Sequence, residues 1–191
     1  MKKVRLKVSI TLSLIITLSI SAPVLAGNVI LIIGDGMDDQ QISIARNYLV
    51  GTTGKLSLDN LPVRSNVQVL TVSDRFPKHP LYVADSANSA TSMASGVVTS
   101  KGRIGTTAGT DEDVVNIIEL AQKRGIRTGV VTTASITDAT PAAFYAHTNS
   151  RGCQNPAMMV NAEFYPRVFV DCSADLKSNG GKGSISEQLV N

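Results

Sequence analysis

The sequence predicts an α/β protein with a mainly parallel central sheet flanked by helices. Residues 28–33 form an unbroken β-branched and aliphatic run, which is typical of a strand covered on both faces. A helical pattern over residues 110–124 precedes a second apolar run over 128–134, which gives the alternation of helix and strand expected of this class. Polar residues follow both runs, at the end of the strands where such sheets bind ligands.

The N-terminus is predicted to be a secretory signal peptide over residues 1–26. It combines a basic start, an apolar run over 8–20 and a small-residue cleavage site over 24–26. A membrane anchor needs about 20 apolar residues, whereas this run is shorter and is soon followed by Pro23. We therefore expect export to the periplasm or beyond, no membrane association after cleavage, and one domain over residues 27–191.

Cleavage would change the charge balance of the chain. Four of the 18 basic residues lie in the signal peptide, and all 15 acidic residues lie after it, so the mature net charge is −1. No basic patch with interleaved aromatic residues remains, which argues against a nucleic-acid partner. In an oxidising compartment, the only two cysteines, Cys153 and Cys172, are predicted to form a disulfide. Zinc ligation by this pair is the weaker alternative, since neither has a second Cys or His at finger-like spacing.

Periodicity and capping signals predict the other elements. They are a helix over 38–48, a strand over 63–72, a helix over 85–96, a short helix over 157–163, a strand over 168–170 and a last helix from 184. The helix over 110–124 is expected to open with a capping box of Thr110 and Asp113. The last helix opens with a capping box and then stops after about two turns, which suggests a truncated chain.

The segment over residues 85–96 is the first candidate site. It reads as a helix of small polar residues with Asp85 and Ser86 at its start, where free backbone N–H groups can hold an anion near the Ser86 hydroxyl. The alternative is that Asp85 or Ser86 simply caps the helix. Asp35, between two glycines after the first apolar run, is either a ligand-binding residue or part of a turn.

Further candidates lie after the second apolar run. Asp138 and Thr140 offer two oxygens that suit Mg²⁺, or else the segment is a helix cap with Pro141 at the first helical position. The Arg151 guanidinium matches a phosphate group bidentately, or is a solvated charge. His79 reads as a solvated loop residue, because no second metal ligand lies near it in the sequence.

Four motifs, in this order, resemble the secreted bacterial alkaline phosphatases. They lie at residues 28–37, 85–91, 138–143 and 150–153, and the resemblance continues through residues 180–189. It implies the fold of that family and hydrolysis of phosphate monoesters. It also implies an enzyme that needs two zinc ions and a magnesium ion in each complete site and that forms a homodimer when complete.

The resemblance also implies roles for individual residues. Ser86 would be the nucleophile that forms a phosphoserine intermediate and a metal-bound oxygen, and Arg151 would bind two phosphate oxygens. Asp35 would bridge zinc and magnesium, Thr140 would ligate the magnesium, and Asp138 would support that metal site. The resemblance likewise places a cysteine of residues 150–153 in a disulfide.

Two departures from the family pattern qualify these expectations. Asp38 stands where the family usually has glycine and adds a carboxylate near the metals. The family's other zinc ligands and a magnesium-binding glutamate lie in its second half, and neither His79 nor His147 falls in a matching motif. We therefore expect the chain to be the N-terminal portion of the enzyme and inactive alone. The alternatives are a non-catalytic phosphate- or metal-binding fragment, or a phosphodiesterase or sulfatase of the same superfamily.

Overall fold

The computed structural model describes residues 27–165 and 168–190, so the predicted signal peptide lies outside the described residues. The chain divides into two units, one ending at Gly34 and one beginning at Asp35. In the first unit, residues 28–33 form neither helix nor strand, and Val29 is 90% exposed. A strand needs a hydrogen-bonded neighbour, and no described residue pairs with this run. Among the described residues, no helix is long and apolar enough to cross a membrane.

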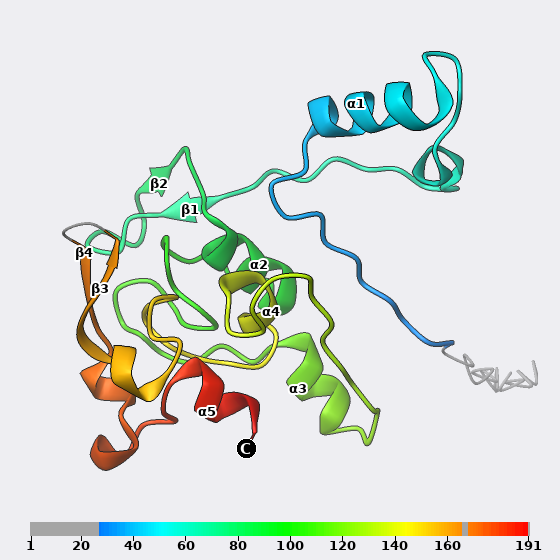
Figure 1. Cartoon of the computed structure of the whole chain (residues 1–191). Helices are drawn as coiled ribbons and strands as arrows, with labels where there is room; N and C mark the ends of the chain where they lie inside the picture. Colours follow the sequence, from blue (N-terminus) through cyan, green and yellow to red (C-terminus); the bar gives the residue numbers. More distant parts are fainter. Residues whose placement is uncertain (1–26, 166–167, 191) are drawn as a thin grey trace, which may run out of the picture. The chain divides into compact units, whose positions relative to one another are not determined.

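The second unit begins with helix α1, Asp39–Val50 (Figure 1). Asp38 is its N-cap and accepts hydrogen bonds from the backbone N–H groups of Gln40 and Gln41. The predicted helix over 38–48 is thus confirmed, with its end two residues later. No residue of α1 is buried. The 3₁₀ helix Ser57–Asn60 is tied to α1 by the ion pair of Arg46 and Asp59, 2.8 Å apart.

The main core lies between helices α2, Ser86–Ser95, and α4, Ala139–Ala142, which pack against each other. Alanines supply most of the contact, and small side chains allow helix backbones to approach closely. Helix α5, Ile185–Leu189, adds its first residue to the same core. The fully buried cluster consists of Ala87, Ile104, Ala139, Ala142, Ala146 and Ile185.

Two small antiparallel sheets are the only sheets in the described residues. Strands β1, Thr71–Val72, and β2, Pro80–Leu81, pair with each other, and β3, Val160–Tyr165, pairs with β4, Val168–Asp171. The predicted parallel central sheet therefore remains unconfirmed. Residues 128–134 contain no strand, and only the end of the predicted strand over 63–72 is formed. Both segments carry β-branched residues that suit strands, but β propensity is realised only against a pairing neighbour.

Helix α3, Ile117–Gln122, begins six residues later than the capping box at Thr110 predicts, because its N-cap is Asn116. The Thr110 hydroxyl instead bonds the Thr107 hydroxyl at 2.7 Å, and Asp111 has a φ of 59°, which no helix accommodates. Asn116 and Glu119 form the actual capping box: each side chain accepts the other residue's backbone N–H. The prediction of a helix was right, but its start was wrong.

The C-terminal part contains a hairpin and short helical turns. The predicted helix over 157–163 is wrong: a 3₁₀ turn, Pro156–Met158, leads directly into β3. The predicted strand over 168–170 is confirmed as β4. Two more 3₁₀ turns, Ser173–Asp175 and Lys177–Asn179, precede α5. A disulfide joins Cys153 to Cys172 and closes a loop that contains the hairpin.

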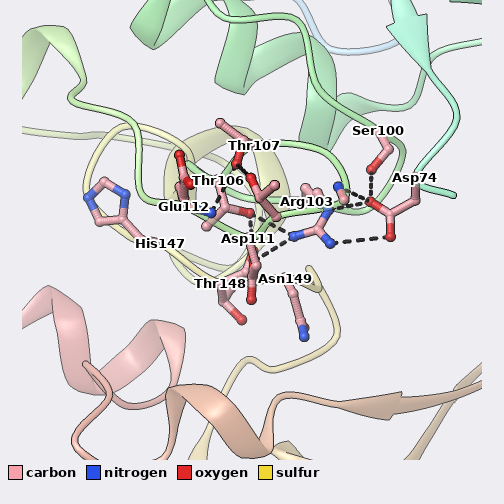
Figure 2. A network of polar contacts seen from close by, with 12 residues as sticks. Asp74, Ser100, Arg103, Thr106, Thr107, Asp111, Glu112, His147, Thr148 and Asn149 are labelled. Atoms are coloured by element: carbon pink, nitrogen blue, oxygen red, sulfur yellow. Dashed lines mark hydrogen bonds and ion pairs between the residues drawn. The ribbon is translucent and has the colours of Figure 1, made fainter. Parts of the chain in front are cut away.

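A buried arginine organises the loop between α2 and α3 (Figure 2). Arg103, whose side chain is 9% exposed, donates from Nε to Asp74 Oδ1 at 2.6 Å and from Nη2 to Asp74 Oδ2 at 3.2 Å. Its Nη1 pairs with the carboxylate of Asp111. Asp74 also accepts from the Ser100 hydroxyl and the Gly109 N–H. These contacts satisfy a charge that would be costly to bury alone.

The disulfide is expected to stabilise the fold through the loop that it closes. Replacing both cysteines, Cys153→Ala with Cys172→Ala, should lower the free energy of unfolding by about 3 kcal/mol, because the unfolded chain regains the entropy of an open loop. Urea unfolding followed by circular dichroism measures this. Equal stability of the oxidised wild type and the double variant would contradict the expectation. The reduced wild type should unfold at nearly the same urea concentration as the variant.

The Asp74–Arg103 pair should make stability depend on acid pH. Chiefly through the hydrogen bond from Arg103, the pKa of Asp74 falls from 3.8 to about 2. A depressed pKa in the folded state adds stability above the unfolded value, and this stability is lost as the pH falls from about 4 to about 2. Asp74→Asn should therefore lose less stability than wild type over that range in urea unfolding. A variant that loses stability as steeply as wild type would refute this contribution.

Candidate active site

Ser86 is the first residue of α2, and its side chain is half-buried. Asp85, not Ser86, caps the helix: its carboxylate accepts the N–H of Asn88 at 3.0 Å and that of Gly102. The Asn88 side chain returns a bond to the N–H of Asp85, completing a capping box. Because the cap uses the neighbouring carboxylate, the Ser86 hydroxyl is not needed for helix formation.

Arg151 lies against Ser86. Its Nη1 is 2.8 Å from Ser86 Oγ and 3.4 Å from Asp85 Oδ2, and its Nη2 is 2.8 Å from Asp138 Oδ1. The side chain is 17% exposed, so Arg151 is not a solvated surface charge. Its Nε is buried and has no hydrogen-bond partner among the described residues. An unpartnered buried donor of a guanidinium is a place where an anionic oxygen would be favourable.

The second pair of predicted site residues is also in contact. Thr140 Oγ1 donates to Asp35 Oδ2 at 2.7 Å, although the two residues are 105 positions apart in the sequence. Thr140 lies in α4, whose N-cap is Asp138. Of the two interpretations that the sequence left open for Asp138, the structure shows the helix cap, through the Ala139 N–H; its contact with Arg151 was not predicted. A carboxylate and a hydroxyl are hard oxygen ligands, so Asp35 and Thr140 fit part of a magnesium shell.

The described residues do not fit a zinc site. They contain no group of three or more His, Cys, Asp or Glu side chains that could hold a metal ion. His79 is exposed and stacks near Phe76, with ring centroids 5.6 Å apart. His147 is 3% exposed, and its ring nitrogens lie 2.8 Å from Gly105 O and 3.1 Å from Glu119 Oε1. Both ring nitrogens of His147 are therefore engaged by groups of the fold.

The contact between His147 and Glu119 joins a buried imidazole to a partly buried carboxylate. Burial alone would raise the pKa of Glu119. The hydrogen bonds from the Asn116 N–H and from His147 outweigh burial and hold the pKa of Glu119 below its ordinary value. The carboxylate therefore stays ionised against the histidine ring.

Asp38, the departure from the family pattern, is engaged elsewhere. Its carboxylate accepts the backbone bonds that begin α1, so it is a helix cap in this structure. Sequence reasoning missed two other features of the site. Asp85 contacts Arg151 as well as capping α2, and the N–H of Arg151 donates to Gly102 O at 2.6 Å. The only sequence signal for the contact of Asp85 with Arg151 was the position of this carboxylate next to Ser86. No sequence signal indicated the hydrogen bond from Arg151 to Gly102.

Comparisons with known proteins show which family the chain belongs to. The family model described as alkaline phosphatase matches residues 26–191. Over 170 residues, 89% of this chain, it is 45% identical to streptomycin-6-phosphate phosphatase of Streptomyces griseus. Over 167 residues, 87% of the chain, it is 41% identical to alkaline phosphatase of Escherichia coli. A solved alkaline phosphatase from the Antarctic bacterium TAB5 aligns with 62% of this chain and 31% of its own, at 36% identity and a TM-score of 0.48.

The matched regions cover only part of each relative. They amount to 35% of the Streptomyces protein and 33% of the Escherichia protein. The chain thus spans about a third of the length of the curated relatives that it matches. The family model nevertheless covers nearly all of the sequence after the predicted signal peptide. This chain belongs to the alkaline phosphatase family.

Proposed function

We propose that this chain is part of an exported, metal-dependent phosphomonoesterase that acts through a phosphoserine intermediate at Ser86. The observation that carries the proposal is the 2.8 Å contact between Ser86 Oγ and Arg151 Nη1. This contact puts a hydroxyl nucleophile beside a cationic donor group with an unpartnered Nε. The printed names of the curated relatives, both phosphatases, support phosphate monoesters as the substrate class.

In the proposed reaction, Arg151 binds the phosphoryl oxygens and neutralises the charge that develops on them. Ser86 Oγ attacks phosphorus; a bond forms between Oγ and phosphorus while the bond from phosphorus to the ester oxygen breaks, and the alcohol leaves. Water then attacks the phosphoserine, breaks the bond from Oγ to phosphorus and releases inorganic phosphate. Because a serine hydroxyl is a weak nucleophile, the step depends on positioning and on local positive charge.

Asp85 and Asp138 orient the guanidinium. They contact different nitrogens of Arg151, so the planar group is held from two sides. A guanidinium fixed in this way presents its donors in one orientation and loses little rotational freedom when phosphate binds. Two carboxylates also offset its charge, so phosphate has to compete with them for the same donors. The two carboxylates therefore fix the orientation of the guanidinium but weaken its electrostatic attraction for phosphate.

For metals, the proposal uses only the oxygens that the chain offers. Asp35 and Thr140 would hold magnesium as two of its ligands, with Asp138 nearby in sequence. Magnesium, when bound, supplies positive charge that lowers the barrier of phosphoryl transfer. The described residues do not fit zinc, so no step is derived through it. Export, a disulfide and a homodimer of the complete enzyme belong to the same proposal.

Ser86→Ala should abolish covalent labelling. A chimera that joins residues 27–191 to the remaining part of the Escherichia coli relative would be incubated with ³²P-labelled phosphate monoester and quenched with acid. We expect a phosphoserine peptide from the parent chimera and none from the variant, because Ser86 supplies the one hydroxyl among the described residues that contacts the Arg151 guanidinium. Mass spectrometry of the digested protein locates the label.

The matched control is Ser89→Ala, one turn further along α2. It removes a hydroxyl from the same helix without touching Arg151, so labelling should persist. Phosphoserine that survives Ser86→Ala would refute the assignment of the nucleophile. Loss of label in both variants would point to damage to α2 rather than to chemistry.

The 191-residue chain by itself is expected not to turn over phosphate monoesters. Its described residues offer part of a magnesium shell but no group that could hold zinc, so the charge needed to activate Ser86 is incomplete. Release of p-nitrophenol from p-nitrophenyl phosphate, with zinc and magnesium added, measures this. Sustained turnover that disappears in Ser86→Ala would show the expectation to be wrong.

A further inference from the structure

The short helix α5 contacts residues that precede Arg151 in the sequence and residues that follow it. Gln188 in α5 accepts the His147 N–H through Oε1 at 2.9 Å and donates from Nε2 to the His147 carbonyl at 2.8 Å. On the other side, the N–H groups of Ile185 and Ser186 donate to the carbonyls of Cys153 and Gln154, each at 3.0 Å. One helix therefore holds the chain before and after the arginine.

From this arrangement we propose that Gln188 is a positioning residue for Arg151. Its side-chain amide satisfies both backbone groups of His147, as a neighbouring strand would. It also donates to Gly183 O at 2.8 Å, which ties it to the loop before α5. Residues 148–152 are thus a short segment whose ends are fixed on α5, and Arg151 is the member of that segment that reaches Ser86.

Two further contacts make the segment rigid. The next residue, Thr148, exchanges both backbone hydrogen bonds with Ile104, at 3.0 and 2.8 Å. The ring nitrogens of His147 contact Gly105 O and Glu119 Oε1. The ring is therefore not available to hydrogen-bond the His147 backbone in place of the Gln188 amide. If the Gln188 amide is removed, the polar backbone groups of His147 lose their partners, and the segment that carries Arg151 loses the support at its N-terminal end while its bonds to Ile104 and Gly102 remain. A small displacement is enough to spoil a bidentate contact with phosphate.

This inference rests on the proposed function for the use of Arg151, and the test separates the two. The full chain is prepared as wild type, Gln188→Leu and the control Gln122→Leu, which removes an exposed hydrogen bond from α3 to Thr128. Each is also made with Arg151→Lys, which keeps the positive charge but not the fork. Binding of inorganic phosphate is measured by equilibrium dialysis with ³²P-phosphate, and backbone hydrogen exchange is followed by mass spectrometry.

Gln188→Leu should weaken phosphate binding about tenfold where Arg151 is present, and by less than about twofold in the Arg151→Lys background. Hydrogen exchange over residues 148–152 should accelerate, while Gln122→Leu changes neither quantity. Equal weakening in both backgrounds would overturn the proposal, because Gln188 would then act on stability in general rather than through Arg151. Unchanged binding with unchanged exchange would overturn it as well.

A wild-type chain that binds no phosphate would count against the proposed function, not against the role of Gln188. Hydrogen exchange then decides the inference alone. Faster exchange over residues 148–152 in Gln188→Leu, with the control unchanged, supports the positioning role. Exchange equal to wild type refutes it.

Discussion

The guanidinium of Arg151 is the group on which the arrangement of the site depends, because it joins the start of α2 to the cap of α4. Through Nη1 it reaches the start of α2, and through Nη2 it reaches the cap of α4. A buried cation has to be paired, and here its partners are the two carboxylates, Asp85 and Asp138, that cap those helices. Capping and cation pairing thus fix the same two helix ends, and Ser86 is placed between them. The alanine contact of α2 with α4 then lets the two ends lie close enough for one side chain to span them.

The supports of Arg151 come from regions far apart in the sequence. Gly102 accepts its N–H, Ile104 pairs with Thr148, and α5 holds the flanking residues. The Arg103 network fixes the same loop from the other side through Asp74 and Asp111. The loop between α2 and α3 contributes Ile104 to the hydrophobic cluster and is also fixed by paired charges and backbone hydrogen bonds. Such a loop can hold a catalytic side chain without a covering sheet.

Local signals in the sequence predicted the features that depend on neighbours along the chain. The caps at Asp138 and Ser184, the start of the helix at Ser86 and the strand over 168–170 follow from residue types within one turn or one strand. The start of α3 was missed because two capping boxes compete within ten residues, and the φ of Asp111 excludes the first. The prediction of a helix over 157–163 was wrong because pairing of β3 with β4 overrides a weak helical pattern. The strand predicted over residues 28–33 is not formed, because no described residue pairs with this run and no local signal specifies a pairing partner.

The candidate site shows the same division between local and long-range information. Ser86, Asp138 and Arg151 were named from motifs, yet their mutual contacts join residues 13 and 65 positions apart and could not be derived from spacing. Gln188 could not be found at all, because nothing in the sequence indicates that a glutamine side chain replaces a strand beside His147. A side chain that pairs with a backbone has no periodicity and no preferred spacing. The residues proposed to carry the chemistry are therefore readable from the sequence, whereas the residue proposed to position them becomes visible only when the chain is folded.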